Sequence, residues 1–190
     1  MARRSRLRLE VDARRLQLIE KGIELFGARG YDDVSIDELA KELGISKGLL
    51  YHYFPTKRDY WISVLEAASS SLLDATEVDA SLPPEVRLER GLDAYLTFVQ
   101  AYAPAYVALL RGGAEPSVAA VVARTRQRFV DRIVGEVAGA GELPTLRLAL
   151  RGWVGFVETV SLEWLEKKEV TKEAVVALAK ATFFATLAAV

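Results

Sequence analysis

The most informative stretch of the chain is SIDELAKELGISKGLLYHYFPTK, residues 35–57. It holds two short amphipathic segments, each opened by a serine, Ser35 or Ser46, of the kind that favours a helix N-cap. Ser35 and Glu38 have the spacing of a capping box, and Gly44 separates the two segments as a turn residue would. The stretch therefore predicts a helix, a tight turn and a second helix that ends before Pro55.

Helical patterns continue on both sides of this stretch. A first helix is expected from about Asp12 to Ala28, and later ones over 57–75, 85–103, 104–111, 117–137, 144–167 and 172–189. Prolines stand at or near several of these starts, where a missing N–H costs little. No run alternates as a strand would. We predict an all-α fold of about nine helices, with a small three-helix domain and a basic N-terminal arm over residues 1–56 and a larger helical domain over 57–190.

Composition excludes several function classes. The chain has 190 residues, 25 Lys+Arg against 26 Asp+Glu, one His and no Cys. Disulfides, thiolate metal sites and His-pair metal sites are therefore not expected, and neither is a cofactor. No phosphate-binding loop or nucleophile elbow occurs, so an enzyme is not expected. The basic start lacks the apolar run of a signal peptide, and the apolar end is interrupted by Lys180, so we expect a cytoplasmic chain without a membrane span.

The second short segment offers a face for recognition. Leu50 is expected to pack against the rest of the small domain, because a helix this short is not stable alone. Its other side presents a cation, two aromatic or imidazole edges and a glycine that lets a duplex approach: Lys47, Gly48, Leu49, Tyr51 and His52. This spacing is typical of a helix-turn-helix that reads DNA. A three-helix packing unit without a DNA role is the alternative.

Two runs carry a resemblance to a known family. FGARGYDDVSIDELA, residues 26–40, and GISKGLLYHYFPTK, residues 44–57, resemble the DNA-binding region of tetracycline-repressor (TetR) family regulators. The resemblance covers about residues 12–60, and the remainder is similar only in length and helical character. It implies a homodimeric bacterial transcription regulator, expected to be a repressor. Such a regulator binds a palindromic double-stranded DNA operator and is released by a small apolar or amphipathic effector held in the C-terminal domain.

The resemblance also implies roles for single residues. Ser35, Tyr53 and Lys57 correspond to phosphate contacts, while the exposed face of the second segment corresponds to base contacts. Leu49 departs from the small or hydroxyl residue usual there, and a thymine methyl becomes its expected partner. The arginine-rich arm either enters a minor groove or remains a solvated tail. The predicted DNA-binding residues are Ser35, Ser46, Lys47, Gly48, Leu49, Tyr51, His52, Tyr53, Lys57, Arg3, Arg4 and Arg6.

The C-terminal segment is apolar nearly all round, which predicts burial against another surface. The resemblance places the last two helices in a four-helix dimer interface. Core helices of a monomer are the alternative, and a dimeric helical interaction protein without sequence-specific DNA binding is the alternative function. The predicted dimer residues are Gly152, Gly155, Trp164, Leu178, Ala181, Phe184, Ala185 and Ala188.

Aromatic residues in the central part of the chain are candidates for a ligand cavity, although aromatic residues at helical spacing also build cores. Glu158 lies on one helical face with Arg147 and Arg151, so it either orients an effector or forms a structural ion pair. The predicted ligand-binding residues are Trp61, Tyr95, Phe98, Tyr102, Tyr106, Phe129, Trp153, Phe156 and Glu158.

Overall fold

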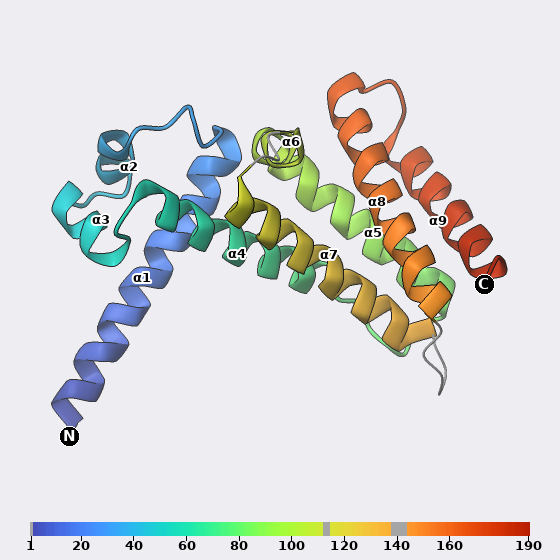
Figure 1. The fold of residues 1–190 in the computed structure, drawn as a ribbon, viewed down its shortest axis with the longest axis horizontal. Helices are drawn as coiled ribbons and strands as arrows, with labels where there is room; N and C mark the ends of the chain where they lie inside the picture. The colour runs from blue at the N-terminus through green and yellow to red at the C-terminus, as the bar shows by residue number, and fades with distance from the viewer. Residues whose placement is uncertain (1, 112–114, 138–143) are drawn as a thin grey trace. The chain divides into compact units, whose positions relative to one another are not determined.

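The computed structural model describes residues 2–111, 115–137 and 144–190, with side chains described from residue 12 onward. Over these ranges the chain forms nine helices and no strand (Figure 1). The helices are α1 (Ala2–Ala28), α2 (Ile36–Glu42), α3 (Lys47–Tyr53), α4 (Lys57–Ala75), α5 (Pro84–Ala101), α6 (Ala103–Arg111), α7 (Pro116–Val137), α8 (Pro144–Lys167) and α9 (Lys172–Ala188). The all-α prediction is confirmed.

Proline and threonine define several helix starts. Pro84, Pro116 and Pro144 are the first residues of their helices, where the amide hydrogen that proline lacks has no intrahelical partner. Thr171 caps α9, because its hydroxyl accepts a hydrogen bond of 3.2 Å from the backbone N–H of Ala174. These local signals explain why the predicted boundaries of α5, α7, α8 and α9 fall within two residues of the observed ones.

The start of α1 differs from the prediction. The helix begins at Ala2, ten residues before the expected Asp12. The intervening run contains neither glycine nor proline, and it places Arg6 four residues before Glu10, so nothing in it stops a helix. The backbone of the predicted arm is therefore helical from Ala2 onward. The side chains of Arg3, Arg4 and Arg6 lie outside the described residues.

The first compact unit comprises Met1–Ser70 and Tyr102–Val118. Within it α4 crosses α1 (Figure 1), and the Tyr60 hydroxyl donates a 2.7 Å hydrogen bond to the Leu18 carbonyl of α1. Burial raises the pKa of Tyr60 well above its usual range, so the phenol stays a donor. Phe54 packs on Tyr60 with ring centroids 4.8 Å apart. Both side chains are fully buried, so α1 and the start of α4 form the support on which α2 and α3 rest.

The second compact unit comprises Ser71–Ala101 and Ala119–Val190. Helices α8 and α9 form an antiparallel pair (Figure 1) that also packs on α5. Trp153 of α8 joins the pair: its indole N–H donates to the Ala179 carbonyl at 3.0 Å, and its ring lies 4.9 Å from that of Phe183. The predicted boundary between residues 56 and 57 remains a prediction. None of the described helices is long and apolar enough to cross a bilayer.

Candidate nucleic-acid interface

Helix α2 is fixed at its start by the predicted capping box. The Ser35 backbone N–H donates to a Glu38 carboxylate oxygen at 2.8 Å, and the Glu38 N–H donates to the Ser35 hydroxyl at 3.2 Å. Arg29 donates a third hydrogen bond to Glu38 at 3.2 Å. The backbone N–H of Ser35, its hydroxyl and Arg29 together lower the pKa of Glu38 from 4.5 to about 2. The ionised carboxylate of Glu38 therefore stabilises the N-terminus of α2, the first helix of the helix-turn-helix.

This pKa predicts a pH dependence of stability. A carboxyl whose pKa is lower in the folded state stabilises the fold above its unfolded pKa of 4.5, and the contribution is lost as the pH falls toward 2. Glu38→Gln keeps a capping side chain but does not titrate. Between pH 6 and pH 3, urea-unfolding midpoints should therefore fall further for the wild type than for Glu38→Gln. Glu42→Gln in the same helix is the matched control, and parallel decreases in all three proteins would contradict the assignment.

The turn between α2 and α3 is made by Gly44. Its φ of 65° lies in the left-handed region, which glycine adopts without the steric penalty that a Cβ causes. The Ile45 N–H returns to the Ala40 carbonyl at 3.0 Å, and Ser46 then caps α3 by accepting the Leu49 N–H at 3.1 Å. The predicted helix, turn and helix are present.

One side of α3 is buried and the other is open. Leu50 is fully buried in the first unit, whereas Lys47, Gly48, Leu49, Tyr51 and His52 are all exposed. A Cβ added at Gly48 would meet no atom within 4 Å, so this part of the backbone is accessible. The five residues predicted to contact base edges therefore lie together on one exposed surface, which we call the recognition face.

Two predicted phosphate contacts are partly engaged within the protein. The Lys57 ammonium donates to the Tyr31 carbonyl at 2.6 Å and lies 4.0 Å from the centre of the Tyr31 ring. Tyr53 is half-buried, with its ring 5.5 Å from that of His52. Lys57 is therefore held at the edge of the first unit by the carbonyl and the ring of Tyr31.

Sequence reasoning missed several polar partners around this surface. Asp37 in α2 forms an ion pair with Lys47 across the turn. Arg58 in the first turn of α4 contacts Glu115 and donates to the Ser117 hydroxyl at 2.9 Å. Asp37 and Lys47 lie ten positions apart on different helices, so no helical spacing in the sequence connects the first pair. Nothing local in the sequence predicts a contact between Arg58 and Glu115.

The predicted ligand-binding residues are divided between the two units. In the first, Trp61 is buried with its ring 4.6 Å from Phe26, and the Tyr102 ring packs so closely on Gly27 that a Cβ there would approach it to 2.5 Å. Tyr106, also in this unit, is half-buried. Trp61 and Tyr102 thus have packing roles.

In the second unit Tyr95 and Trp153 are buried, while Phe98, Phe129 and Phe156 are half-buried. Glu158 forms a bidentate ion pair with Arg126 of α7. The predicted partners of Glu158, Arg147 and Arg151, instead contact Asp131 and Gln127. The observed pair is a contact between helices and not one along α8.

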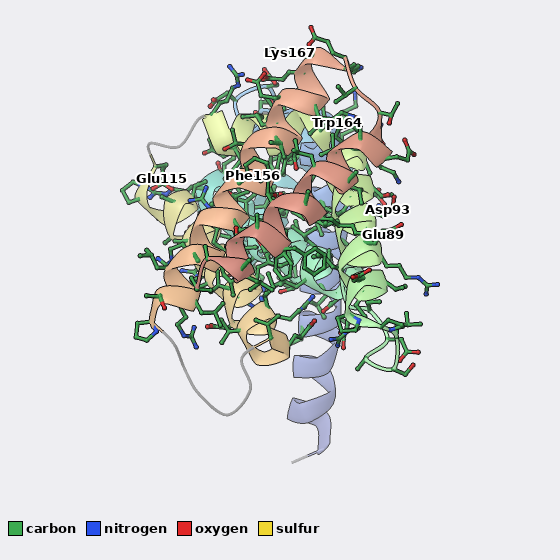
Figure 2. The ribbon with its side chains drawn as sticks, turned by 90° about the vertical axis from the view of Figure 1, so that its right-hand side faces the viewer. Glu89, Asp93, Glu115, Phe156, Trp164 and Lys167 are labelled. Atoms are coloured by element: carbon green, nitrogen blue, oxygen red, sulfur yellow. The ribbon has the colours of Figure 1, made fainter. Side chains whose placement is uncertain are left out.

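A groove of about 360 Å³ lies between α5 and α9. Glu89 and Asp93 project from the same side of α5 (Figure 2), and each pairs with a lysine of α9. No predicted ligand-binding residue lines this groove, whose wall consists of Glu89, Arg90, Asp93, Glu173, Val176, Ala177 and Lys180.

Most predicted dimer residues lie on an open apolar surface of α8 and α9. A Cβ at Gly152 or Gly155 would meet nothing within 4 Å, and Leu178 and Phe184 are 48% and 41% exposed. Ala181, Ala185 and Ala188 are exposed too. Trp164 differs: its ring is buried near the end of α8 (Figure 2), where its N–H donates to the Val170 carbonyl at 3.1 Å. We therefore leave Trp164 out of this surface and add Leu148, which is exposed on α8 and was not predicted.

Two capped helices, a left-handed glycine turn and an open second helix define a helix-turn-helix protein of the DNA-binding class. Residues 18–59 match the family model described as bacterial regulatory proteins, tetR family, and residues 84–186 match the tetracyclin repressor-like C-terminal domain. The second match extends the family likeness to the part where the sequence motifs showed only helical character. The chain belongs to the TetR family of transcriptional regulators, which are not enzymes.

Individual relatives agree with this assignment. A TetR-family transcriptional regulator from Streptomyces coelicolor is 32% identical, with a TM-score of 0.86 over 94% of this chain and 82% of its own. The transcriptional regulator AcuR of Cereibacter sphaeroides is 39% identical over 37% of this chain and 34% of its own length. The transcriptional activator FasR of Mycolicibacterium smegmatis is 28% identical over 66% of this chain and 59% of its own. The chain thus spans less than two thirds of either curated relative.

Proposed function

We propose that this regulator binds a palindromic DNA operator as a homodimer, with α3 of each protomer in a major groove. The observation that carries the proposal is the recognition face. Helix α3 has only seven residues and depends on the packing of Leu50, yet it leaves five neighbouring residues uncovered. A helix maintained in this way by the rest of its unit is suited to present side chains to a groove.

The chemistry of the recognition face fits base edges. Lys47 is a cationic donor for guanine oxygen and nitrogen or for a phosphate, and Leu49 offers an apolar contact to a thymine methyl. Tyr51 and His52 add donors, acceptors and ring faces. Ser35, Ser46, Tyr53 and Lys57 are proposed to contact the phosphate backbone beside it, which fixes orientation without reading sequence.

Dimerisation is the second part of the proposal. The exposed surface of α8 and α9 contains Leu148, Leu178, Phe184, two open glycines and three exposed alanines. Small residues allow close helix approach, and exposed large apolar residues favour a covered surface. A twofold pair formed through this surface would present two recognition helices, which must lie about 34 Å apart to enter successive major grooves.

Lys47→Ala tests the DNA-binding proposal. Removing a base-contacting cation from each protomer should weaken operator binding by about tenfold or more, with a smaller change in the dependence of log K on log salt than the loss of a phosphate contact would give. The probe is a 30-base-pair duplex selected by the wild-type protein from a random pool, and the measurement is fluorescence anisotropy at several salt concentrations.

Lys167→Ala is the control for net charge, because Lys167 lies at the end of α8 and pairs with Glu163. It should leave operator affinity unchanged. Equal operator affinities of Lys47→Ala and the wild type would mean that α3 does not contact the DNA. If the wild type selects no duplex from the pool, the alternative of an interaction protein without sequence-specific DNA binding is favoured.

We further propose that the bound dimer represses transcription in the cytoplasm by covering promoter DNA and that a small apolar or amphipathic effector releases it. Half-buried aromatic side chains in the second unit, such as Phe98 and Phe129, support an apolar ligand. An effector can act only if it binds the DNA-incompetent state more tightly. Release of labelled operator by added amphipathic compounds checks the effector, and transcription from an operator-bearing promoter checks the sign, since the relative FasR is named an activator.

A further inference from the structure

The first turns of α2 and α3 carry opposite charges that meet across the turn. Asp37 is the second residue of α2 and Lys47 the first residue of α3. The Lys47 ammonium lies 2.9 Å from one carboxylate oxygen of Asp37 and 3.0 Å from the other. Contact with Asp37 also raises the pKa of Lys47. The cation of the recognition face is therefore neutralised by a side chain beside it.

Asp37 is not needed to hold the capping box. The cap of α2 is made by Ser35 and Glu38, and Arg29 binds Glu38 and not Asp37. The carboxylate of Asp37 points outward, with 72% of the side chain exposed, while Lys47 is 46% exposed. An exposed ion pair of this kind is weak, so a nearby phosphate can compete for Lys47. Any duplex that reaches Lys47 must also meet the negative charge of Asp37.

The effect of Asp37 on DNA affinity depends on whether Lys47 meets phosphates or base edges. Non-specific complexes rest almost entirely on phosphate contacts, so a carboxylate at the surface repels the DNA and retains the lysine. In the proposed specific complex Lys47 donates to a guanine edge, a contact for which phosphates do not compete. Asp37 thus weakens binding to phosphates more than binding to a matched groove.

We propose that Asp37 is a specificity-determining residue of this regulator, which weakens the contacts of Lys47 with phosphates in general DNA more than its contacts with the correct base sequence. The inference rests on the proposed function, because it assumes that the recognition face enters the major groove. It predicts that removing the carboxylate makes the protein a stronger but less selective DNA binder.

Asp37→Asn keeps the shape of the side chain and removes its charge. On a random-sequence 30-base-pair duplex this variant should bind roughly two- to fivefold more tightly than the wild type, with a salt dependence steeper by about one per protomer. On the duplex selected by the wild-type protein, the affinity should change by less than about twofold. The ratio of the two affinities, measured by anisotropy, should therefore fall.

Asp74→Asn is the matched control. Asp74 is exposed near the end of α4, 17 residues after Lys57, and the substitution changes the net charge equally. It should leave both affinities unchanged. In a Lys47→Ala background, Asp37→Asn should lose most of its effect on the random duplex if the carboxylate acts through the lysine.

Failure of the proposed role of Asp37 can be told apart from failure of DNA binding itself. Equal effects of Asp37→Asn and Asp74→Asn would overturn the inference alone, and so would weaker binding of Asp37→Asn to both duplexes with an unchanged circular dichroism spectrum. If the full-length wild type binds neither duplex at low salt, the proposed function fails and the inference with it. A selective gain on random DNA that depends on Lys47 supports both.

Discussion

Gly22→Val should lower the free energy of unfolding by about 3 kcal/mol, at the upper end for overpacking a buried position. Gly22 lies in α1 where α4 crosses it. A Cβ at this position would lie 2.5 Å from the Tyr60 hydroxyl oxygen and 2.5 Å from a Val64 methyl carbon. Tyr60 cannot simply swing away, because its hydroxyl is bound to the Leu18 carbonyl and its ring is fully buried. The added carbons must therefore push α1 and α4 apart.

The measurement is urea unfolding followed by far-ultraviolet circular dichroism at one protein concentration, since any self-association would make the midpoint depend on concentration. Gly135→Ala in α7 is the control. A Cβ there would meet nothing within 4 Å, and the substitution should stabilise the helix by about 0.5–1 kcal/mol. A Gly22→Val protein as stable as the wild type would mean that α1 and α4 do not pack through Gly22 and Tyr60.

Gly22→Val should also lower the affinity for the operator. Phe54 ends α3 and packs against Tyr60, so the position of the recognition face depends on the same contact between α1 and α4. Arg15 of α1 adds to this support: its guanidinium lies 5.0 Å from the centre of the Phe54 ring and donates to the Ser63 hydroxyl at 3.0 Å. A protein that is folded but loosened at Gly22 should therefore lose operator affinity without any change to the exposed residues of α3.

The structure shows which features of the fold were predictable from the sequence alone. The capping box of α2, the proline starts and the glycine turn are local signals, so the helix-turn-helix and most helix boundaries were predictable from residues a few positions apart. The exposed face of α3 was predictable for the same reason, since burial of Leu50 fixes what faces outward. The helical start at Ala2 was missed because charged residues without a breaker suit a tail and a helix equally.

Candidate ligand-binding residues of the second unit were harder to predict, because aromatic residues recur with the same periodicity in a core and in a cavity wall. Trp153 and Trp164 both donate their indole N–H to backbone carbonyls within the protomer, at Ala179 and Val170. These hydrogen bonds can be seen only in the three-dimensional structure and not in the sequence. Glu158 illustrates the same limit, since its partner Arg126 lies 32 positions away and no helical spacing connects them. Pairings between distant helices are set by topology, and local patterns do not encode it.

If the proposed homodimer forms through α8 and α9, Leu178→Glu should yield a monomer at micromolar concentration and weaken operator binding by at least about a hundredfold. Leu178 is 48% exposed in the protomer and lies on α9 with the exposed Ala181 and Phe184. In a twofold interface each residue occurs twice, so one substitution places two unpaired carboxylates in an apolar surface. Unpaired buried charges cost about 3–5 kcal/mol, which is enough to dissociate a dimer of ordinary affinity.

Val170→Glu is the matched control. Val170 is an apolar residue, 54% exposed, in the connection between α8 and α9, and the variant carries the same added charge. It should remain dimeric by sedimentation analysis and should bind the selected operator as the wild type does. A Leu178→Glu protein that sediments as a dimer would move the interface to another surface. A monomeric variant with full operator affinity would instead show that one recognition helix suffices, and the requirement for two helices about 34 Å apart would be wrong.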